Sequence, residues 1–481
     1  MLLNKFIINK NEKVSKQTKI LTNYINKKVN KKNFSKLSLY VSKTFNIPED
    51  VIKFENKKFL SLNHNFINGT FQKKFKLKYL LIYIFNFFFL ISIIFIFSKN
   101  KKKNKRVEII FDEILSNDEL GRAKKFLKNF KSYKIVTSSN VKKFDEQIIY
   151  SNQIGASRKL IKKAIFPILI IFFKTIILSI REKTNLLPIL INLLKKIIKY
   201  ETIFKNNTSD FLFQERSYNT CAVKNYIFKK YGGRVTACTQ RIIFHLGNTS
   251  FFINTDVLFS LGKKTAKILK YTGSKIKKII PMGSTVFETK WLNAKKTKPK
   301  NIDVIYIGGN NAPAFATDSK YINNYYEQLN WLKKLKYEFP KLKFVFKHHE
   351  NNSFHDKREL SILKNSNIKR ISSPTASGKL NYSYGYAINS KIRLTWCSTM
   401  GYELLGHGYL CYFLDPKKQN ESFLHNYNFN QKFRVTTYYD LKKKIMKILK
   451  KNQDTIKNKS DFCLNSKNID KKILSVLRNF R

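Results

Sequence analysis

Residues that can bind a phosphate follow two apolar segments in the second half of the chain. Gly308 and Gly309 come directly after one segment, and Lys347 and His348 end the next. Glycines leave backbone amides open to an anion because no side chain stands in the way. A lysine and an imidazole can hold a phosphate or protonate it as it leaves. The four residues predict an anion-binding site; an ordinary tight loop and a solvated polar turn are the alternatives for each pair taken alone.

A third apolar segment, 391–396, is followed by two hydroxyl residues and a carboxylate. Ser398 and Thr399 stand where they can cap a helix, and Glu403 falls about one turn later. A capped helix N-terminus offers hydroxyls and amides to an anion. Glu403 reaches a ribose if its helix points inward. The pattern alone is also that of a plain helix cap, and its position after a predicted strand favours the binding site.

Strands and helices must bring these residues together, and short apolar strands alternate with helical stretches along both halves of the chain. Such alternation predicts an α/β fold with parallel, doubly wound sheets, whose ligands bind at the carboxyl ends of the strands. The stretch 292–300 separates two Rossmann-like domains, at 106–291 and 301–481. The expected strands are 106–111, 133–137, 210–213, 235–238, 241–245, 254–262 and 279–284 in the first domain, and 301–307, 342–347, 368–371, 391–396 and 410–414 in the second.

The order of these motifs resembles the C-terminal domain of GT-B fold glycosyltransferases. It is most similar to the bacterial surface-carbohydrate group, which comprises capsule and lipopolysaccharide transferases that use CMP-sugars, and to the related CDP-glycerol glycerophosphotransferases. The resemblance implies that His348, Ser398 and Thr399 contact the donor phosphate and that Glu403 holds the ribose. His349 replaces the proline and Leu404 the alanine that are usual in this group. The resemblance extends over residues 241 to about 435, and residues 1–105 contain nothing comparable.

In enzymes of this architecture the first domain supplies a general base, and three positions at predicted strand ends can do so. Asp112 precedes Glu113, Glu215 precedes Arg216, and His245 ends a segment that resembles the Gln-His-Gly element of the group. A carboxylate or imidazole there can deprotonate an acceptor hydroxyl while the second domain stabilises the leaving nucleotide. This scheme needs no metal and no cofactor. Each of the three, taken alone, is better explained as a structural or solvated residue.

Composition limits the class of protein and its partners. The chain has 481 residues with 93 Lys or Arg and 31 Asp or Glu, which gives a net charge of +62. This charge favours anionic partners such as phospholipid head groups, nucleotides or nucleic acid. The apolar content of 43% excludes wholesale disorder, and 16 glycines and 5 cysteines exclude collagen-like and disulfide-scaffold classes. No CxxC pair or other zinc motif is present, so we expect no metal site.

Two apolar segments in the first half point to a membrane. Residues 77–97 contain one charge in 21 residues, and a helix of this length can span a hydrocarbon core of about 30 Å. We expect a membrane-associated helix there, spanning or interfacial, after a basic head at 1–76. Residues 164–180 contain Pro167 and Lys174 and predict an interfacial or groove-lining helix, with core packing as the alternative. The lysines and arginine that follow residue 98 favour an inner-membrane location with the catalytic part on the cytoplasmic side.

Three hypotheses follow for the function. The first is a membrane-associated glycosyltransferase that moves a sugar from a nucleotide donor, with CMP-sugars favoured, to a surface glycan or lipid-linked acceptor. The second keeps the fold and uses CDP-glycerol or another CDP-alcohol. The third is a non-catalytic protein that binds nucleic acid or a membrane surface through its lysines. No known nucleic-acid-binding signature is visible and the lysines are evenly spread, so we expect no nucleic-acid partner.

Overall fold

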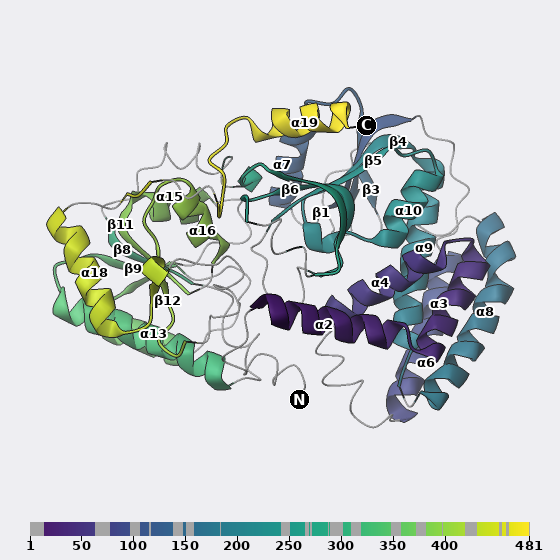
Figure 1. The fold of residues 1–481 in the computed structure, drawn as a ribbon, viewed down its shortest axis with the longest axis horizontal. Helices are drawn as coiled ribbons and strands as arrows, with labels where there is room; N and C mark the ends of the chain where they lie inside the picture. The colour runs from purple at the N-terminus through teal and green to yellow at the C-terminus, as the bar shows by residue number, and fades with distance from the viewer. Residues whose placement is uncertain are drawn as a thin grey trace.

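The structure of the chain is a computed structural model. It describes residues 14–62, 77–96, 106–114, 117–137, 148–150, 158–182, 184–241, 251–264, 269, 272–286, 288, 302–308, 319–347, 357–371, 381–396, 398–418, 431–451, 455–457 and 461–480. Figure 1 shows two α/β domains side by side, with a group of helices packed below the N-terminal one.

The N-terminal domain is built on a seven-stranded sheet in the order β3-β2-β1-β4-β5-β6-β7. Every neighbouring pair is parallel, as in a doubly wound fold. The strands are β1 (Val107–Ile114), β2 (Tyr133–Thr137), β3 (Ile148–Tyr150), β4 (Ser209–Gln214), β5 (Val235–Thr239), β6 (Asn254–Ser260) and β7 (Lys275–Pro281).

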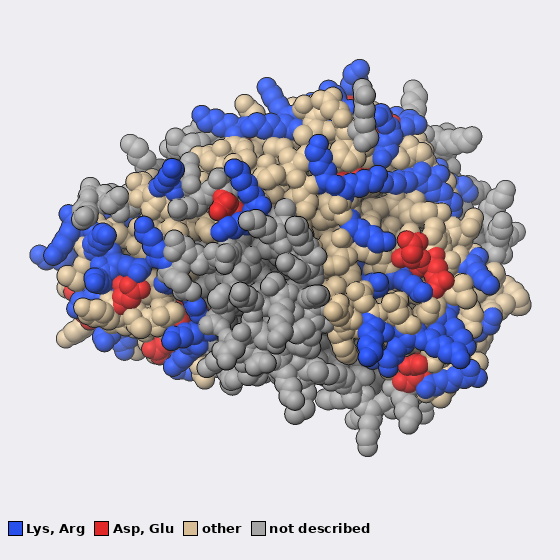
Figure 2. All heavy atoms as spheres, viewed as in Figure 1, with Lys and Arg blue, Asp and Glu red and all other residues tan. Residues whose placement is uncertain are grey.

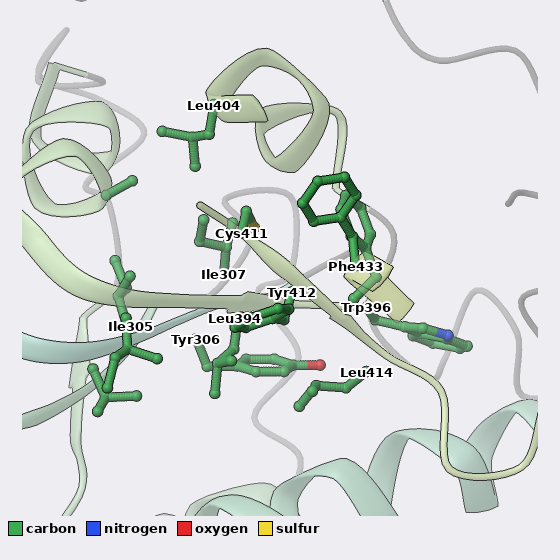
Figure 3. Close-up of a cluster of buried hydrophobic side chains, with 14 of the residues drawn as sticks. Ile305, Tyr306, Ile307, Leu394, Trp396, Leu404, Cys411, Tyr412, Leu414 and Phe433 are labelled. Carbon is green, nitrogen blue, oxygen red and sulfur yellow. The ribbon is translucent and has the colours of Figure 1, made fainter. Parts of the chain in front are cut away.

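The C-terminal domain repeats this topology with six parallel strands in the order β10-β9-β8-β11-β12-β13. The strands are β8 (Ile302–Ile307), β9 (Phe344–Lys347), β10 (Lys369–Ile371), β11 (Ser390–Thr395), β12 (Tyr412–Leu414) and β13 (Arg434–Val435). The helices are α13 (Ser319–Glu338), α14 (Lys357–Asn365), α15 (Asn381–Asn389), α16 (Thr399–Gly406) and α18 (Tyr438–Lys451). Figure 3 shows Tyr306, Ile307 and Leu394 of the central strands packed with Leu404 and Leu414 in its core.

Alternate residues of the N-terminal strands enter two different cores. Ile109 and Phe111 pack with α7 (Asn117–Leu127) on one face of the sheet. Ile110 packs on the other face, together with α9 (Leu187–Asn206) and α10 (Ala222–Lys230). This follows from the period of two in a strand, which sends successive side chains to opposite faces. Because both faces are covered, the central strands are mostly buried, whereas the edge strand β7 keeps exposed lysines.

The N-terminal helices belong to the same domain, since a buried polar network joins them to it. They are α2 (Val14–Val29), α3 (Lys32–Phe45) and α4 (Glu49–Leu62). Glu55 of α4 binds Lys196 of α9 at 2.5 Å, and its other oxygen accepts from the first amide of α10, at Ala222, at 2.8 Å. Lys58 is buried, and its Nζ donates to the carbonyl of Phe251 at 2.9 Å. Burial lowers the pKa of Lys58 to about 8.

The two apolar segments form helices that pack on α9. Residues 77–97 form α6 (Leu77–Ile96), and the second segment lies within α8 (Arg158–Arg181). Among the residues described, no helix combines the length and the apolar character needed to cross a membrane. Residues 77–96 thus form the expected helix, and of its two expected forms, spanning or interfacial, the spanning one finds no support among the described residues. The sequence gives an apolar segment of sufficient length, but Leu80, Phe87 and Leu90 use one side of it to pack against the protein.

The end of the chain returns from the C-terminal domain to the N-terminal one. Residues 461–464, which we call the interdomain strap, run against both domains, and α19 (Ile469–Asn479) then packs on the α7 face of the first sheet. Leu464 N–H donates to the carbonyl of Leu261 at 2.7 Å. Arg478 of α19 binds Glu108 of β1 at 2.8 Å. The two domains are therefore held together by the last 21 residues as well as by the chain between them.

The α/β fold of two Rossmann-like, parallel-sheet domains is confirmed. Most predicted strands are present to within a few residues. The strand expected at 241–245 falls outside the described residues except for Arg241, which follows β5. β3 and β13 were not predicted, because strands of three and two residues are too short to show a pattern.

Candidate functional site

Each sheet reverses its strand order at one point. In the N-terminal sheet the reversal lies between β1 and β4, and in the C-terminal sheet it lies between β8 and β11. At such a point the connections leave neighbouring strands on opposite faces, so that the carboxyl ends of the strands open a crevice to a ligand. The residues that follow these strands are therefore the first candidates for a site.

Gly308 and the first turn of α16 lie at the crevice of the C-terminal domain. Gly308 follows β8, and its N–H donates to the last carbonyl of β9 at 2.9 Å. Thr395 ends β11 and ties it to β8, since its Oγ1 donates to the carbonyl of Ile307 at 2.8 Å. Ser398 caps α16 by accepting from the N–H of Met400 at 3.3 Å. The positive end of the α16 dipole therefore lies beside the crevice and favours an anion there.

Glu403 links the two domains at this point. The residue lies in the second turn of α16 and is 2% exposed. Its Oε1 accepts from Oγ of Ser284, which follows β7 of the other domain, at 2.5 Å. Its Oε2 accepts from the hydroxyl of Tyr384 in α15 at 2.9 Å. Both oxygens of this buried carboxylate thus accept hydrogen bonds from hydroxyl groups. The two hydroxyls of a ribose can donate to a carboxylate in the same way.

Glu215 stands on the N-terminal side, directly after β4. Its carboxylate binds Arg122 of α7 through two contacts, Nε to Oε1 at 3.0 Å and Nη2 to Oε2 at 3.3 Å. Its backbone carbonyl accepts from Oγ1 of Thr239 at the end of β5, at 2.7 Å. The side chain is 12% exposed. Next to it, Arg216 forms an ion pair with Glu119.

Two arginines of the N-terminal domain act on the C-terminal residues. Burial and then the carboxylate of Glu403 raise the pKa of Tyr384 well above its usual value, while the positive charges of Arg241 and Arg122 oppose that rise. Arg241 follows β5 and forms no ion pair with any described carboxylate. The arrangement brings strand ends of both sheets to one site.

Asp112 is placed differently from Glu215. It lies near the end of β1, is 2% exposed, and binds Lys224 of α10 at 2.6 Å. Its second oxygen, Oδ1, has no hydrogen-bond partner among the described residues. Glu113, which follows, has a φ of 70°, a left-handed conformation that marks the register shift of β1. In this arrangement the carboxylate of Asp112 is held in a buried ion pair and not presented to solvent.

The structure thus brings together some of the predicted residues. Gly308, Ser398, Thr399 and Glu403 lie at the carboxyl end of the C-terminal sheet. Lys347 ends β9 at the same edge and is buried. Gly309, His348 and His245 lie outside the described residues, and their predicted roles stay predictions.

Four residues of the site were not assigned a role from the sequence. Ser284 follows β7 in a Gly-Ser pair that resembles the hinge-proximal strand end of the family. The sequence therefore contained a signal for its position. Arg241 was placed inside a strand. Tyr384 and Arg122 lie on helices, away from any strand end, and only the tertiary structure brings them to Glu403 and Glu215.

The interdomain strap passes beside this site, and glycines make room for it. A Cβ at Gly262 would lie 2.3 Å from the carbonyl of Asp461, and one at Gly283 would lie 2.3 Å from that of Leu464. A Cβ at Gly406, at the end of α16, would lie 2.3 Å from the carbonyl of Cys463. The carbonyl groups of the strap therefore contact the glycine backbone of both domains, where no Cβ would fit. These contacts fix the position of α16 relative to β7.

No protein-family model matches the chain, and no curated protein matches it in sequence. Solved structures with a comparable arrangement include UDP-GlcNAc 2-epimerase from Methanocaldococcus jannaschii, with a TM-score of 0.46 and 14% identity over 77% of this chain and 99% of that one. The same enzyme from Neisseria meningitidis bound to UDP-GlcNAc has a TM-score of 0.46 and 11% identity over 77% and 99%. The wall teichoic acid polymerase TagF has a TM-score of 0.45 and 10% identity over 84% and 96%. We therefore base the function on the residues of the site itself.

Proposed function

We propose that the protein is a glycosyltransferase that moves a sugar from a nucleotide donor, with a CMP-sugar favoured, to a surface glycan or a lipid-linked acceptor. We place it at the inner membrane with its catalytic part on the cytoplasmic side. The observation that carries the proposal is the position of Glu403. It is a buried carboxylate with two hydroxyl donors, one turn beyond a capped helix N-terminus, where both sheets direct their carboxyl ends.

The donor nucleotide fits the C-terminal half of the site. A ribose diol can take the place of the Ser284 hydroxyl at Oε1 of Glu403, because both are hydroxyl donors. The phosphate then lies toward Ser398, Thr399 and the N-terminus of α16, where the helix dipole stabilises its charge. The predicted phosphate contact of His348 belongs to the same edge of the sheet, since it follows β9. Negative charge that develops on the leaving nucleotide is stabilised by these groups.

The acceptor fits the N-terminal half. Of the three predicted bases, Glu215 is favoured by its place at the site, while Asp112 is committed to Lys224. In the transfer, a base takes the proton of the acceptor hydroxyl and the hydroxyl oxygen bonds to the anomeric carbon. The bond from that carbon to the donor phosphate breaks, and the nucleotide leaves with the electron pair. Arg122 occupies both oxygens of Glu215, so Glu215 must move away from Arg122 before it can accept the proton of the acceptor.

Thermal unfolding in the presence of nucleotides tests the proposal. The full chain is heated with CMP, CDP, UDP or GDP, each with and without divalent metal. A ligand at 100 times its Kd contributes about 2.7 kcal/mol, which raises Tm by a few degrees. The proposal predicts a selective shift with CMP that needs no metal and is lost in Glu403→Ala. A selective shift with CDP favours a CDP-alcohol transferase instead, and no shift with any nucleotide in a folded sample contradicts the proposal.

A further inference from the structure

Exposed apolar side chains gather on two helices. Ten of the thirteen large apolar side chains that are exposed in the described parts of the chain lie on α6 and α8. They recur every three or four residues along each helix, so each set forms one stripe. We call them together the α6–α8 face: Leu81, Ile82, Phe85, Phe88 and Phe89 on α6, and Phe166, Ile170, Phe173, Ile177 and Ile180 on α8.

The two stripes lie side by side because the opposite sides of both helices are fixed to the protein. Phe87 of α6 and Phe172 of α8 are buried, and their rings stack with centroids 3.9 Å apart. Phe88 also meets Phe172 edge to face, at 5.6 Å. Both helices contact α9, whose apolar side chains are buried. The exposed stripes therefore cannot pack onto the core, because the opposite sides of both helices are already packed there.

Two polar residues, Asn86 and Ser92, are exposed on α6 among the apolar side chains, and the hydroxyl of Ser92 is satisfied inside its own helix. Ser92 is exposed on the same side of α6 as Phe85 and Phe88, and its Oγ donates to the carbonyl of Phe88 at 3.0 Å. A hydroxyl that already has its partner can enter an apolar medium without losing a hydrogen bond. Ser92 can thus leave water at little polar cost, whereas the amide of Asn86 must stay in contact with the polar head groups.

The surroundings of the face are predominantly basic, with Glu182, which accepts from Asn33 of α3, as an acid at the end of α8. α3 packs along α8. Together, the sequences of α3, α6 and α8 hold ten Lys or Arg and no Asp or Glu. Lys174 and Arg181 of α8 are exposed beside the stripe, and Lys43 of α3 is exposed on the helix that packs against it. In the sequence, six further Lys or Arg follow α6 within residues 99–106. Figure 2 shows basic side chains spread over the visible face of the molecule, with few acidic ones.

We propose that the α6–α8 face binds the surface of an anionic phospholipid bilayer, with both helices lying in the plane of the interface. The apolar stripes enter the boundary between head groups and acyl chains, and the basic rim contacts the phosphates. Only one side of the pair is available to lipid, because the other side is packed on α9. The stripe of α8 from Phe166 to Ile180 is about 21 Å long at 1.5 Å per residue. Such a length suits a helix that lies along the interface.

This proposal does not depend on the proposed function, because vesicle binding needs no nucleotide. If both are correct, the membrane face lies on the acceptor domain, since α6 and α8 pack on the domain that carries Glu215. A lipid-linked acceptor would then be presented to the half of the site that we assign to it.

Vesicle co-flotation of the full chain tests the proposal. Vesicles of phosphatidylcholine alone are compared with vesicles that contain 30% phosphatidylglycerol. We expect binding to the anionic vesicles, weakening as salt rises because salt screens the basic rim. The triple variant Phe85→Ser, Phe166→Ser, Phe173→Ser removes three of the most exposed side chains of the face. We expect its partition into anionic vesicles to fall at least tenfold.

A matched control removes exposed aromatic side chains elsewhere. Tyr337 and Tyr439 are 87% and 75% exposed, on α13 and α18. The double variant Tyr337→Ser, Tyr439→Ser should float like the wild type. Circular dichroism checks that all variants are folded. Equal flotation of the triple variant and the wild type overturns the proposal, as does a folded wild-type protein that binds neither vesicle.

A tryptophan probe gives a second measurement that does not depend on losing binding. Phe173→Trp should be quenched by vesicles whose acyl chains carry bromine, and Tyr337→Trp should not. Light scattering without lipid identifies the other possible occupant of the face. A wild-type dimer that the triple variant converts to a monomer, with no quenching of the Phe173→Trp probe, means that the face joins two copies of the chain and overturns the proposal.

Discussion

The hydrogen bond between Ser284 and Glu403 should oppose nucleotide binding, so that its removal strengthens binding. Oγ of Ser284 lies 2.5 Å from Oε1 of Glu403 and comes from the other domain. A ribose that uses Oε1 must first displace this donor. A hydrogen bond to a charged group contributes about 1.5–3 kcal/mol, and about 1.4 kcal/mol corresponds to a tenfold change in Kd. We therefore expect Ser284→Ala to bind nucleotide about tenfold more tightly while its ligand-free form unfolds more easily.

Tyr384→Phe is the matched control for this prediction. It also removes one hydroxyl from Glu403, at 2.9 Å from Oε2, but this donor belongs to the same domain as Glu403 and orients it. The ligand-free protein should again lose stability, whereas nucleotide affinity should fall. Titration calorimetry gives the affinities, and denaturant unfolding gives the stabilities. Unchanged or weaker binding by Ser284→Ala, in a folded protein, refutes the idea that the serine occupies a ligand position.

Three further predictions concern stability. Lys224→Met should destabilise the protein by about 3–5 kcal/mol because it leaves the buried carboxylate of Asp112 without its cation, and adding Asp112→Asn should recover part of the loss in denaturant unfolding. Burial and then the charge of Glu288 raise the pKa of Asp470 to about 6. The folded state therefore keeps a proton that the unfolded chain loses, so stability should fall between about pH 4 and pH 6, and Asp470→Asn should remove most of that fall. Gly262→Ala should cost about 1–3 kcal/mol because its Cβ meets the backbone of the interdomain strap; Gly121→Ala, with open space around it, should stabilise α7 by roughly 0.5–1 kcal/mol, and equal melting temperatures for the two variants would contradict this.

Strands of the central sheets were the most predictable part of the fold. β1, β4 and β8 are covered on both faces and contain short apolar runs bounded by polar residues, whereas β11 alternates apolar residues with Lys391 and the buried Arg393. Their parallel direction also follows from the alternation of strands and helices. The site residues that directly follow such strands, such as Glu215, could be found for the same reason.

Residues that reach the site from elsewhere could not be found in this way. Tyr384 and Arg122 lie on helices, and the hydrogen bonds that bring them to the site join groups 19 and 93 residues apart. The contact between the interdomain strap and Gly262 could not be predicted either, because only the tertiary structure brings these segments together.

The apolar segment at 77–97 shows the opposite limit. Hydropathy indicates that this segment avoids water, but it does not say how the two sides of the helix are used. The stacking of Phe87 on Phe172 fixes one side to the protein and leaves Phe85 on the other. A sequence pattern with apolar residues all around the helix cannot separate these two sides.

Calorimetric titration of CMP into the wild-type protein and into Glu403→Ala tests the central claim most directly. The site predicts that the wild type binds CMP without metal and that the variant, still folded by circular dichroism, binds at least about 10-fold more weakly because the ribose loses its carboxylate partner. Equal affinity in the two proteins, or no binding of CMP by a folded wild type, would contradict the assignment of Glu403 and with it the proposed donor.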